Sequence, residues 1–122
     1  MADLTGINIL IVEDEEMLLE LMIEEFQAAG AFVLASTTGS EALEKFKQNH
    51  FHALITDIHI PDGNGNWLVE EVCKMTENPP AIFLCSGVEF SYETEDCPHI
   101  CAVFRKPIKI SEILREVKRF FS

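Results

Sequence analysis

Short apolar runs alternate with amphipathic stretches along the whole chain. Five runs have the length and branched side chains of buried strands, at residues 8–12, 32–35, 53–56, 81–85 and 102–104. Apolar positions at helical spacing predict helices at residues 15–29, from Thr38 onward, at 66–75 and at 111–121. Strands that are apolar on both faces and separated by helices predict a parallel sheet covered on both sides. We therefore expect one α/β domain over residues 1–122, with a five-stranded, doubly wound sheet and right-handed crossovers.

Local signals refine the predicted helices. Thr38 and Glu41 have the spacing of a capping box, and Gly30 ends the helix before them. The expected inward-facing residues of the first and third helices are Leu18, Leu21, Met22, Phe26, Leu68, Val69 and Val72. Residues 88–100 carry no apolar stripe, and a Cys-Pro pair interrupts them. The fourth crossover helix is therefore predicted to be short or frayed.

The balance of charge is strongly acidic. Nine Lys and Arg against 21 Asp and Glu give a formal net charge of −12. Nucleic acids and anionic membranes are bound by clustered basic residues, so we expect neither as a direct partner. No apolar run approaches the ~20 residues of a membrane-spanning helix, and the start of the chain lacks a basic signal region. We expect a cytoplasmic protein whose charge suits a metal cation or the basic face of a partner protein.

The four cysteines are expected to be reduced thiols, because no secretion signal accompanies them. Cys97 and Cys101 have a spacing that fits half of a zinc site. No second pair of ligands is evident, and small buried hydrophobic residues are the alternative interpretation.

Polar residues follow the predicted strands at the points where the strands end. The carboxyl ends of parallel strands form the edge at which ligands bind in such folds. The residues expected to meet there are Glu13 and Asp14 after the first strand, Asp57 after the third, Ser86 after the fourth and Lys106 after the fifth. Three acids, one hydroxyl and one ammonium therefore converge on a single crevice.

Three clustered carboxylates repel one another unless a cation relieves them. Mg²⁺ is the natural candidate, since it prefers oxygen ligands and is bound by a few carboxylates together with a phosphoryl group. Asp14 and Asp57 are the expected direct ligands, Glu13 acts through water, and the backbone carbonyl of His59 supplies a third protein oxygen. Lys106 neutralises charge at Asp57, and Ser86 donates one hydrogen bond to an added oxygen. Such an arrangement suits phosphoryl transfer with Asp57 as the nucleophile.

The ordered set of these residues resembles that of receiver domains of bacterial two-component response regulators, similar to the CheY-like members. The motif consists of Glu13-Asp14, Asp57 with Pro61 and Gly65 after it, Ser86-Gly87 and Lys106-Pro107, and it covers essentially the whole chain. The resemblance implies Mg²⁺ and phosphorylation of Asp57 from the phosphohistidine of a sensor histidine kinase or a histidine phosphotransfer protein. It also implies self-catalysed loss of the phosphoryl group to water, a downstream protein target, no enzymatic activity beyond this chemistry, and a monomer or weak dimer.

One position departs from the family pattern. The family usually has an aromatic residue three positions before the lysine, whereas this chain has Val103 there and Phe104 next to it. An apolar Val88 stands two residues after Ser86, where the family tunes dephosphorylation. Because of Val103 and the weak segment at residues 88–100, the alternative function is a receiver-fold module that binds proteins without being phosphorylated.

Two further interpretations remain beside these. Glu13 and Asp14 are also suited to cap the following helix, where acids favour the positive end of its dipole. A small hydrolase of the haloacid dehalogenase type also uses an aspartate nucleophile with Mg²⁺. That class normally has an aspartate two residues after the nucleophile, and this chain has His59 there.

Overall fold

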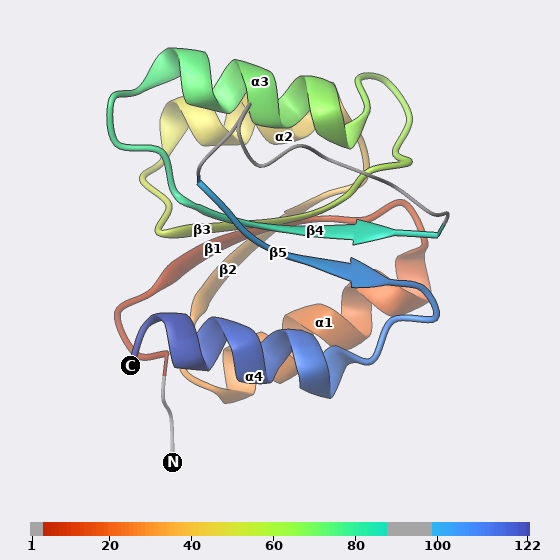
Figure 1. Cartoon of the computed structure of the whole chain (residues 1–122), viewed down its shortest axis with the longest axis vertical. Coiled ribbons are helices and arrows are strands. Elements are labelled where there is room, and N and C mark those ends of the chain that lie inside the picture. Colours follow the sequence, from red (N-terminus) through yellow and green to blue (C-terminus); the bar gives the residue numbers. More distant parts are fainter. Residues whose placement is uncertain (1–3, 88–98) are drawn as a thin grey trace.

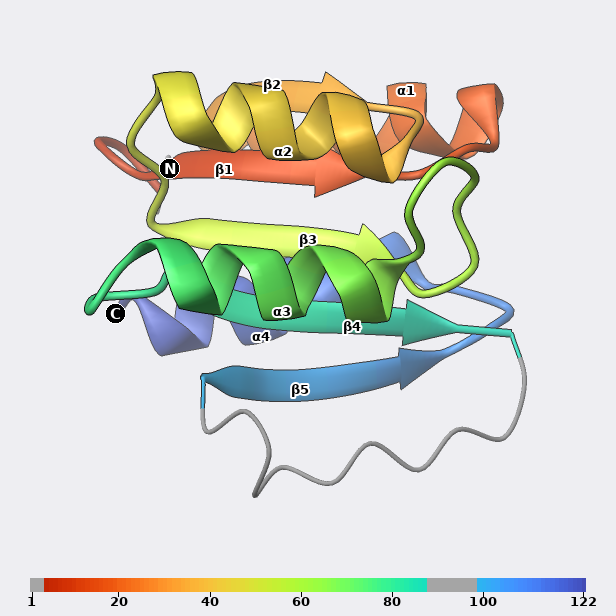
Figure 2. The same ribbon diagram turned by 90° about the horizontal axis from the view of Figure 1, so that it is seen from above.

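A computed structural model describes residues 4–87 and 99–122, and it confirms the predicted α/β class. The strands are β1 (Asn8–Val12), β2 (Phe32–Ser36), β3 (Ala53–Asp57), β4 (Ala81–Ser86) and β5 (Ile100–Arg105). They form one parallel sheet in the order β2-β1-β3-β4-β5, which Figure 2 shows from above. The helix predicted between the last two strands falls largely outside the described residues, as do Val88 and Cys97.

The described helices cover both faces of this sheet. They are α1 (Glu16–Ala28), α2 (Gly39–Gln48), α3 (Gly65–Met75) and α4 (Ile110–Phe120). Helices α2 and α3 lie on one face and α1 and α4 on the other (Figure 1). Within the described ranges, no helix combines the length and the apolar character that crossing a membrane requires.

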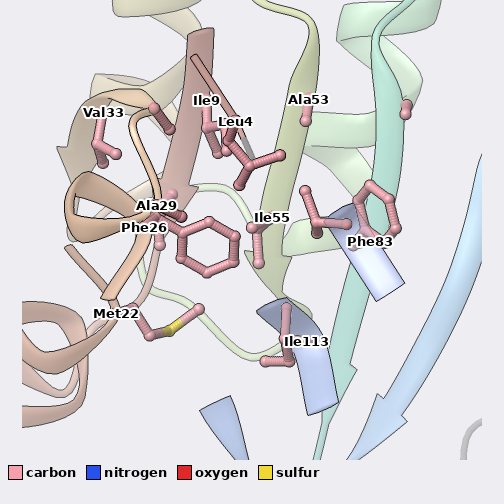
Figure 3. Close-up of a cluster of buried hydrophobic side chains, with 14 of the residues drawn as sticks. Leu4, Ile9, Met22, Phe26, Ala29, Val33, Ala53, Ile55, Phe83 and Ile113 are labelled. Carbon is pink, nitrogen blue, oxygen red and sulfur yellow. The ribbon is translucent and has the colours of Figure 1, made fainter. Parts of the chain in front are cut away.

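Each face of the sheet has its own buried cluster. On the α1 and α4 side, Phe26 and Ile113 from the helices pack against Ile55 and Phe83 from the strands (Figure 3). On the other side, the buried apolar side chains of α3 are Leu68, Val69 and Val72, as predicted. The two layers hold the sheet rigid, so the carboxyl ends of its strands form a fixed platform.

The predicted inward face of α1 is wrong at one position. Leu21 is 50% exposed, and Leu19 is buried in its place together with Met22 and Phe26. These three residues are spaced three and four apart and form one narrow stripe. Leu21 lies beside the stripe, where it lines a groove between α1 and α4 instead of the core.

The side chains near the end of strand β5 differ in exposure between its two faces. Phe104 packs against the core on the α1 and α4 side, whereas Val103 is 42% exposed. Successive residues of a strand point to opposite faces. Phe104 therefore does not replace the aromatic residue that the family usually has at position 103.

Helix α3 begins directly against the end of β3. A Cβ on Gly65 would lie 2.5 Å from the carbonyl oxygen of Asp57 and 2.7 Å from the Cα of Ile58. Asn64 caps the helix by accepting the Trp67 N–H at 2.9 Å. Glycine is thus required at position 65 by close approach of two backbones.

Both ends of the described chain lie at the edge where the strands begin (Figure 1). The Phe121 ring packs edge-on against His52 just before β3, with ring centroids 6.5 Å apart. The His52 Nδ1 accepts the N–H of Asn8, the first residue of β1, at 2.9 Å. Leu4 is fully buried just before the same strand.

Candidate functional site

The strands deliver their polar residues to a single edge of the sheet. All five strands run in the same direction, so their carboxyl ends lie together (Figure 2). Asp57 is the last residue of β3 and Ser86 is the last residue of β4. Glu13 and Asp14 directly follow β1, and Lys106 directly follows β5. The clustering expected from the sequence is therefore present in the fold.

Asp57 is a buried carboxylate, and each of its two oxygens accepts a hydrogen bond. It is 2% exposed, and its Oδ2 accepts a hydrogen bond from Lys106 Nζ at 2.5 Å. Its Oδ1 accepts the His59 backbone N–H at 3.0 Å. The hydrogen bond from the ammonium is charge-assisted, and the two donors together fix the orientation of the carboxyl group.

Three carboxylates form a candidate cation site. One carboxylate oxygen from each of Glu13, Asp14 and Asp57 lies within 4.8 Å of the other two. Glu13 and Asp57 are buried, whereas Asp14 is exposed. Donors that are all carboxylate oxygens suit a hard divalent cation such as Mg²⁺. The residues present therefore fit the ion that the sequence predicts.

Burial raises the pKa of Glu13 to about 7. A hydrogen bond with Asp14 and the negative charge of Asp57 act in the same direction as burial. The Glu15 backbone N–H, which donates to Glu13 Oε2 at 3.2 Å, lowers the pKa in part, and so does Lys106. Glu13 therefore keeps its proton to a higher pH than an exposed glutamate does.

Lys106 links two of these acids. Its Nζ lies 3.7 Å from Glu13 Oε1 in addition to its contact with Asp57. Partial burial lowers the pKa of Lys106, but the hydrogen bond to Asp57 and the neighbouring acids outweigh it and raise that pKa above its ordinary value. The backbone N–H of Lys106 also donates to the Ser86 carbonyl oxygen at 2.8 Å. This hydrogen bond holds the lysine next to β4.

The structure places Ser86 and His59 beside Asp57. Ser86 is 1% exposed at the end of β4, the strand that pairs with β3. His59 contacts Asp57 through its backbone N–H. The hydroxyl role of Ser86 and the carbonyl role of His59 stay predictions.

Two neighbours of the site were not assigned a role from the sequence. Cys85 pairs with Asp57 across the sheet, and burial followed by the charge of Asp57 raises the pKa of its thiol to about 12. The amino-terminal end of α2 contacts the loop after Asp57 through Gly39 and Ser40. Sequence around Thr38 indicates only a helix start, so nothing in it points to this long-range contact.

The metal-free protein is expected to lose stability as the pH rises through the Glu13 titration. The ordinary pKa of this carboxyl is 4.5, and its folded pKa is about 7. Below pH 4.5 the group is protonated in both states. Between these values the unfolded chain releases its proton and the folded chain keeps it, so the free energy of unfolding falls.

Glu13→Gln is expected to remove this pH dependence and to stabilise the metal-free protein at pH 8 by about 2 kcal/mol. The measurement is urea unfolding in EDTA at pH 5 and pH 8. Glu20→Gln, at an exposed position of α1, is the matched control. A Glu13→Gln variant with the same pH dependence as the wild type would show that the pKa of Glu13 is not raised in the folded protein.

Comparison with known proteins gives a consistent assignment. A family model described as the response regulator receiver domain matches residues 9–118. Response regulator RR06 of Streptococcus pneumoniae serotype 2 is 25% identical over 120 residues, which cover 93% of this chain and 54% of RR06. The chain thus spans about half the length of that relative.

Solved structures share the fold. The non-phosphorylated HemR receiver domain of Leptospira biflexa is 28% identical with a TM-score of 0.84, covering 96% of this chain and 95% of that one. A chain of the CheX-CheY-BeF3-Mg complex of Borrelia burgdorferi is 21% identical with a TM-score of 0.82, covering 97% and 91%. Because the family model spans most of the sequence, the chain belongs to the response regulator receiver domain family.

Proposed function

We propose that this receiver domain accepts a phosphoryl group on Asp57, with Mg²⁺, and that the modification switches its binding to a downstream protein. The donor is the phosphohistidine of a sensor histidine kinase or of a histidine phosphotransfer protein, met in the cytoplasm. The observation that carries this proposal is the buried Asp57 carboxylate, held between the Lys106 ammonium and the acids Glu13 and Asp14.

The transfer needs a nucleophile that stays ionised and in place. A carboxylate oxygen of Asp57 attacks the phosphorus, a P–O bond forms, and the P–N bond to the donor imidazole breaks with its electron pair returning to nitrogen. Lys106 stays beside the carboxylate and faces the charge that develops on the transferred oxygens. The His59 N–H fixes the orientation of the carboxyl group.

The predicted ligands of Mg²⁺ are Asp14 and Asp57, with Glu13 through water and the His59 carbonyl as a further oxygen. When bound there, the ion would supply positive charge to the phosphoryl oxygens. Glu13 and Asp14 stand at the end of β1, from where they would orient the ion. Ser86, buried at the end of β4, is placed to donate its hydroxyl to one added oxygen.

The return step is self-catalysed hydrolysis. A water oxygen attacks the phosphorus, the P–O bond to Asp57 breaks, and inorganic phosphate leaves while the carboxylate is restored. The chain needs no other substrate, so we propose that it is a signalling switch and not an enzyme with an independent turnover.

Incubation with acetyl phosphate tests the proposal. We expect intact-mass spectrometry to show one added phosphoryl group in millimolar Mg²⁺ and none in EDTA, and peptide mapping to place the group on Asp57. A phosphoryl group on another residue, or equal labelling in EDTA, would contradict it.

The alternative is a receiver-fold module that binds proteins without phosphorylation. The exposed Val103 favours this alternative, because Phe104 points to the opposite face and does not supply the usual aromatic side chain. Binding of a candidate partner before and after acetyl phosphate treatment separates the two functions. Equal affinity in both states would favour the alternative.

A further inference from the structure

The amino-terminal end of α2 holds the loop that follows Asp57. The Gly39 N–H donates to the Pro61 carbonyl oxygen at 3.1 Å, and the Ser40 N–H donates to the Asp62 carbonyl oxygen at 2.8 Å. The Ser40 hydroxyl also donates to the Asp62 carboxylate. The first N–H groups of a helix have no partner within it. In α2 the loop satisfies the N–H groups of Gly39 and Ser40, and the Thr38 hydroxyl satisfies that of Glu41.

The loop is closely packed between two helices. A Cβ on Gly39 would lie 1.8 Å from the carbonyl oxygen of Gly63, so no side chain fits at position 39. On the other side, a Cβ on Gly63 would lie 2.5 Å from the ring of Trp67 in α3. Residues 61–63 are therefore held between the start of α2 and the Trp67 ring.

Backbone preference alone does not explain the aspartate in this loop. Asp62 has a φ of 54° and Gly63 has a φ of 89°. Glycine adopts such left-handed values without a steric penalty, whereas aspartate only tolerates them. What aspartate adds is a carboxylate for the Ser40 hydroxyl, next to the positive end of the α2 dipole.

The same loop is tied to the reactive carboxylate. The Ile58 N–H donates to the Cys85 carbonyl oxygen at 2.9 Å, and the Gly65 N–H donates to the Ile58 carbonyl oxygen at 2.8 Å. Between these two ties, the His59 N–H donates to Asp57. Residues 61–63 begin two positions after His59, so we expect a shift of this loop to move the His59 backbone.

We propose that Ser40 and Asp62 are positioning residues for the Asp57 site. Their contact fixes the loop so that His59 keeps its N–H on Asp57 and its carbonyl oxygen available to a cation. This inference rests on the proposed function, because it assigns to α2 the task of holding the metal-binding loop in shape. The two residues act through the loop and not on the reacting atoms.

Three variants test the pair. Ser40→Ala removes the hydroxyl, Asp62→Gly removes the carboxylate and relieves the left-handed backbone, and Ser40→Thr restores a hydroxyl. Asn49→Ala is the control, because Asn49 Nδ2 donates to the Lys45 carbonyl at the far end of α2. The readouts are Mg²⁺ affinity by calorimetry, the initial rate of phosphorylation by acetyl phosphate, and urea unfolding in EDTA.

We expect Ser40→Ala and Asp62→Gly to weaken Mg²⁺ binding and slow phosphorylation about tenfold. Ser40→Thr and Asn49→Ala should behave like the wild type in both. Asp62→Gly should weaken Mg²⁺ binding without loss of stability, since glycine accommodates the positive φ. Weaker binding in a variant of equal or higher stability is a result that a merely structural role would not produce.

Trp67 offers a readout that needs no metal. It is the one tryptophan in the sequence, and its ring packs against Gly63. In EDTA, the emission of Ser40→Ala and Asp62→Gly should differ from that of the wild type and of Asn49→Ala, because the loop moves off the ring.

The outcomes separate this inference from the proposed function. If the wild type neither binds Mg²⁺ nor becomes phosphorylated, the proposed function fails and the positioning role fails with it. If the wild type does both and Ser40→Ala and Asp62→Gly match it, only the positioning role is overturned.

Discussion

The Asp57→Asn variant is expected to take up no phosphoryl group from acetyl phosphate under conditions in which the wild type is fully labelled. The amide keeps the shape of the side chain but lacks the negative oxygen that attacks phosphorus. It also lowers the negative charge next to Glu13 and Asp14, which lie within 4.8 Å of it. We therefore expect weaker Mg²⁺ binding and a metal-free protein that is at least as stable as the wild type.

Two measurements check this prediction. Intact-mass spectrometry follows the labelling, and urea unfolding in EDTA at pH 8 follows the stability. Glu70→Gln is the matched control, because it removes a negative charge from an exposed position of α3. Labelling of the Asp57→Asn variant to the wild-type extent would move the acceptor to another residue and overturn the proposed function.

Replacing Lys106 with methionine is expected to slow phosphorylation about 100- to 1000-fold, the usual effect of removing one electrostatic donor from a reacting centre. The variant retains the nucleophile, so slow labelling should continue. Without the ammonium, the buried Asp57 loses its closest charged partner and Glu13 loses a cation at 3.7 Å. Breaking such a pair should destabilise the metal-free protein by about 3 kcal/mol, because the ammonium is partly exposed and the cost lies at the lower end of the usual range.

Lys109→Met is the control for this change. Lys109 is a lysine three residues further along the chain, and its side chain is 72% exposed at 4.0 Å from Glu112. Loss of an exposed pair of this kind changes stability little. Time courses of labelling and urea unfolding in EDTA compare the two variants. A Lys106→Met protein that is labelled as fast as Lys109→Met would remove Lys106 from the mechanism.

The sequence predicts the fold well because its apolar periodicity is strong. Strands apolar on both faces are read directly as a parallel sheet, and the edge where strands end then brings Glu13, Asp57 and Lys106 together without any further information. Glu13 follows β1 and Asp57 ends β3, two strands that are buried on both faces, and Lys106 follows β5, whose register is set by pairing with β4. That edge is a property of topology, so a correct topology suffices to find it.

Finer features depend on contacts that no local pattern contains. The choice between Leu19 and Leu21 for the core is decided by how α1 is rotated against the sheet, and both residues fit a helical stripe. The close approach of Gly39, at the start of α2, to Gly63 joins two segments that are far apart in sequence. The raised pKa of Glu13 requires the burial and neighbours that only the folded chain supplies.

The chain ends at the opposite edge of the sheet from Asp57, with the Phe121 ring against His52. A carboxyl-terminal affinity tag or a biosensor linkage attached after Ser122 would therefore leave the reactive edge facing solution. Immobilised in this orientation, the domain presents the edge that carries Asp57 to a large donor protein. A fusion partner at this end would likewise lie on the side of the domain away from Asp57 and would leave the phosphorylation site accessible.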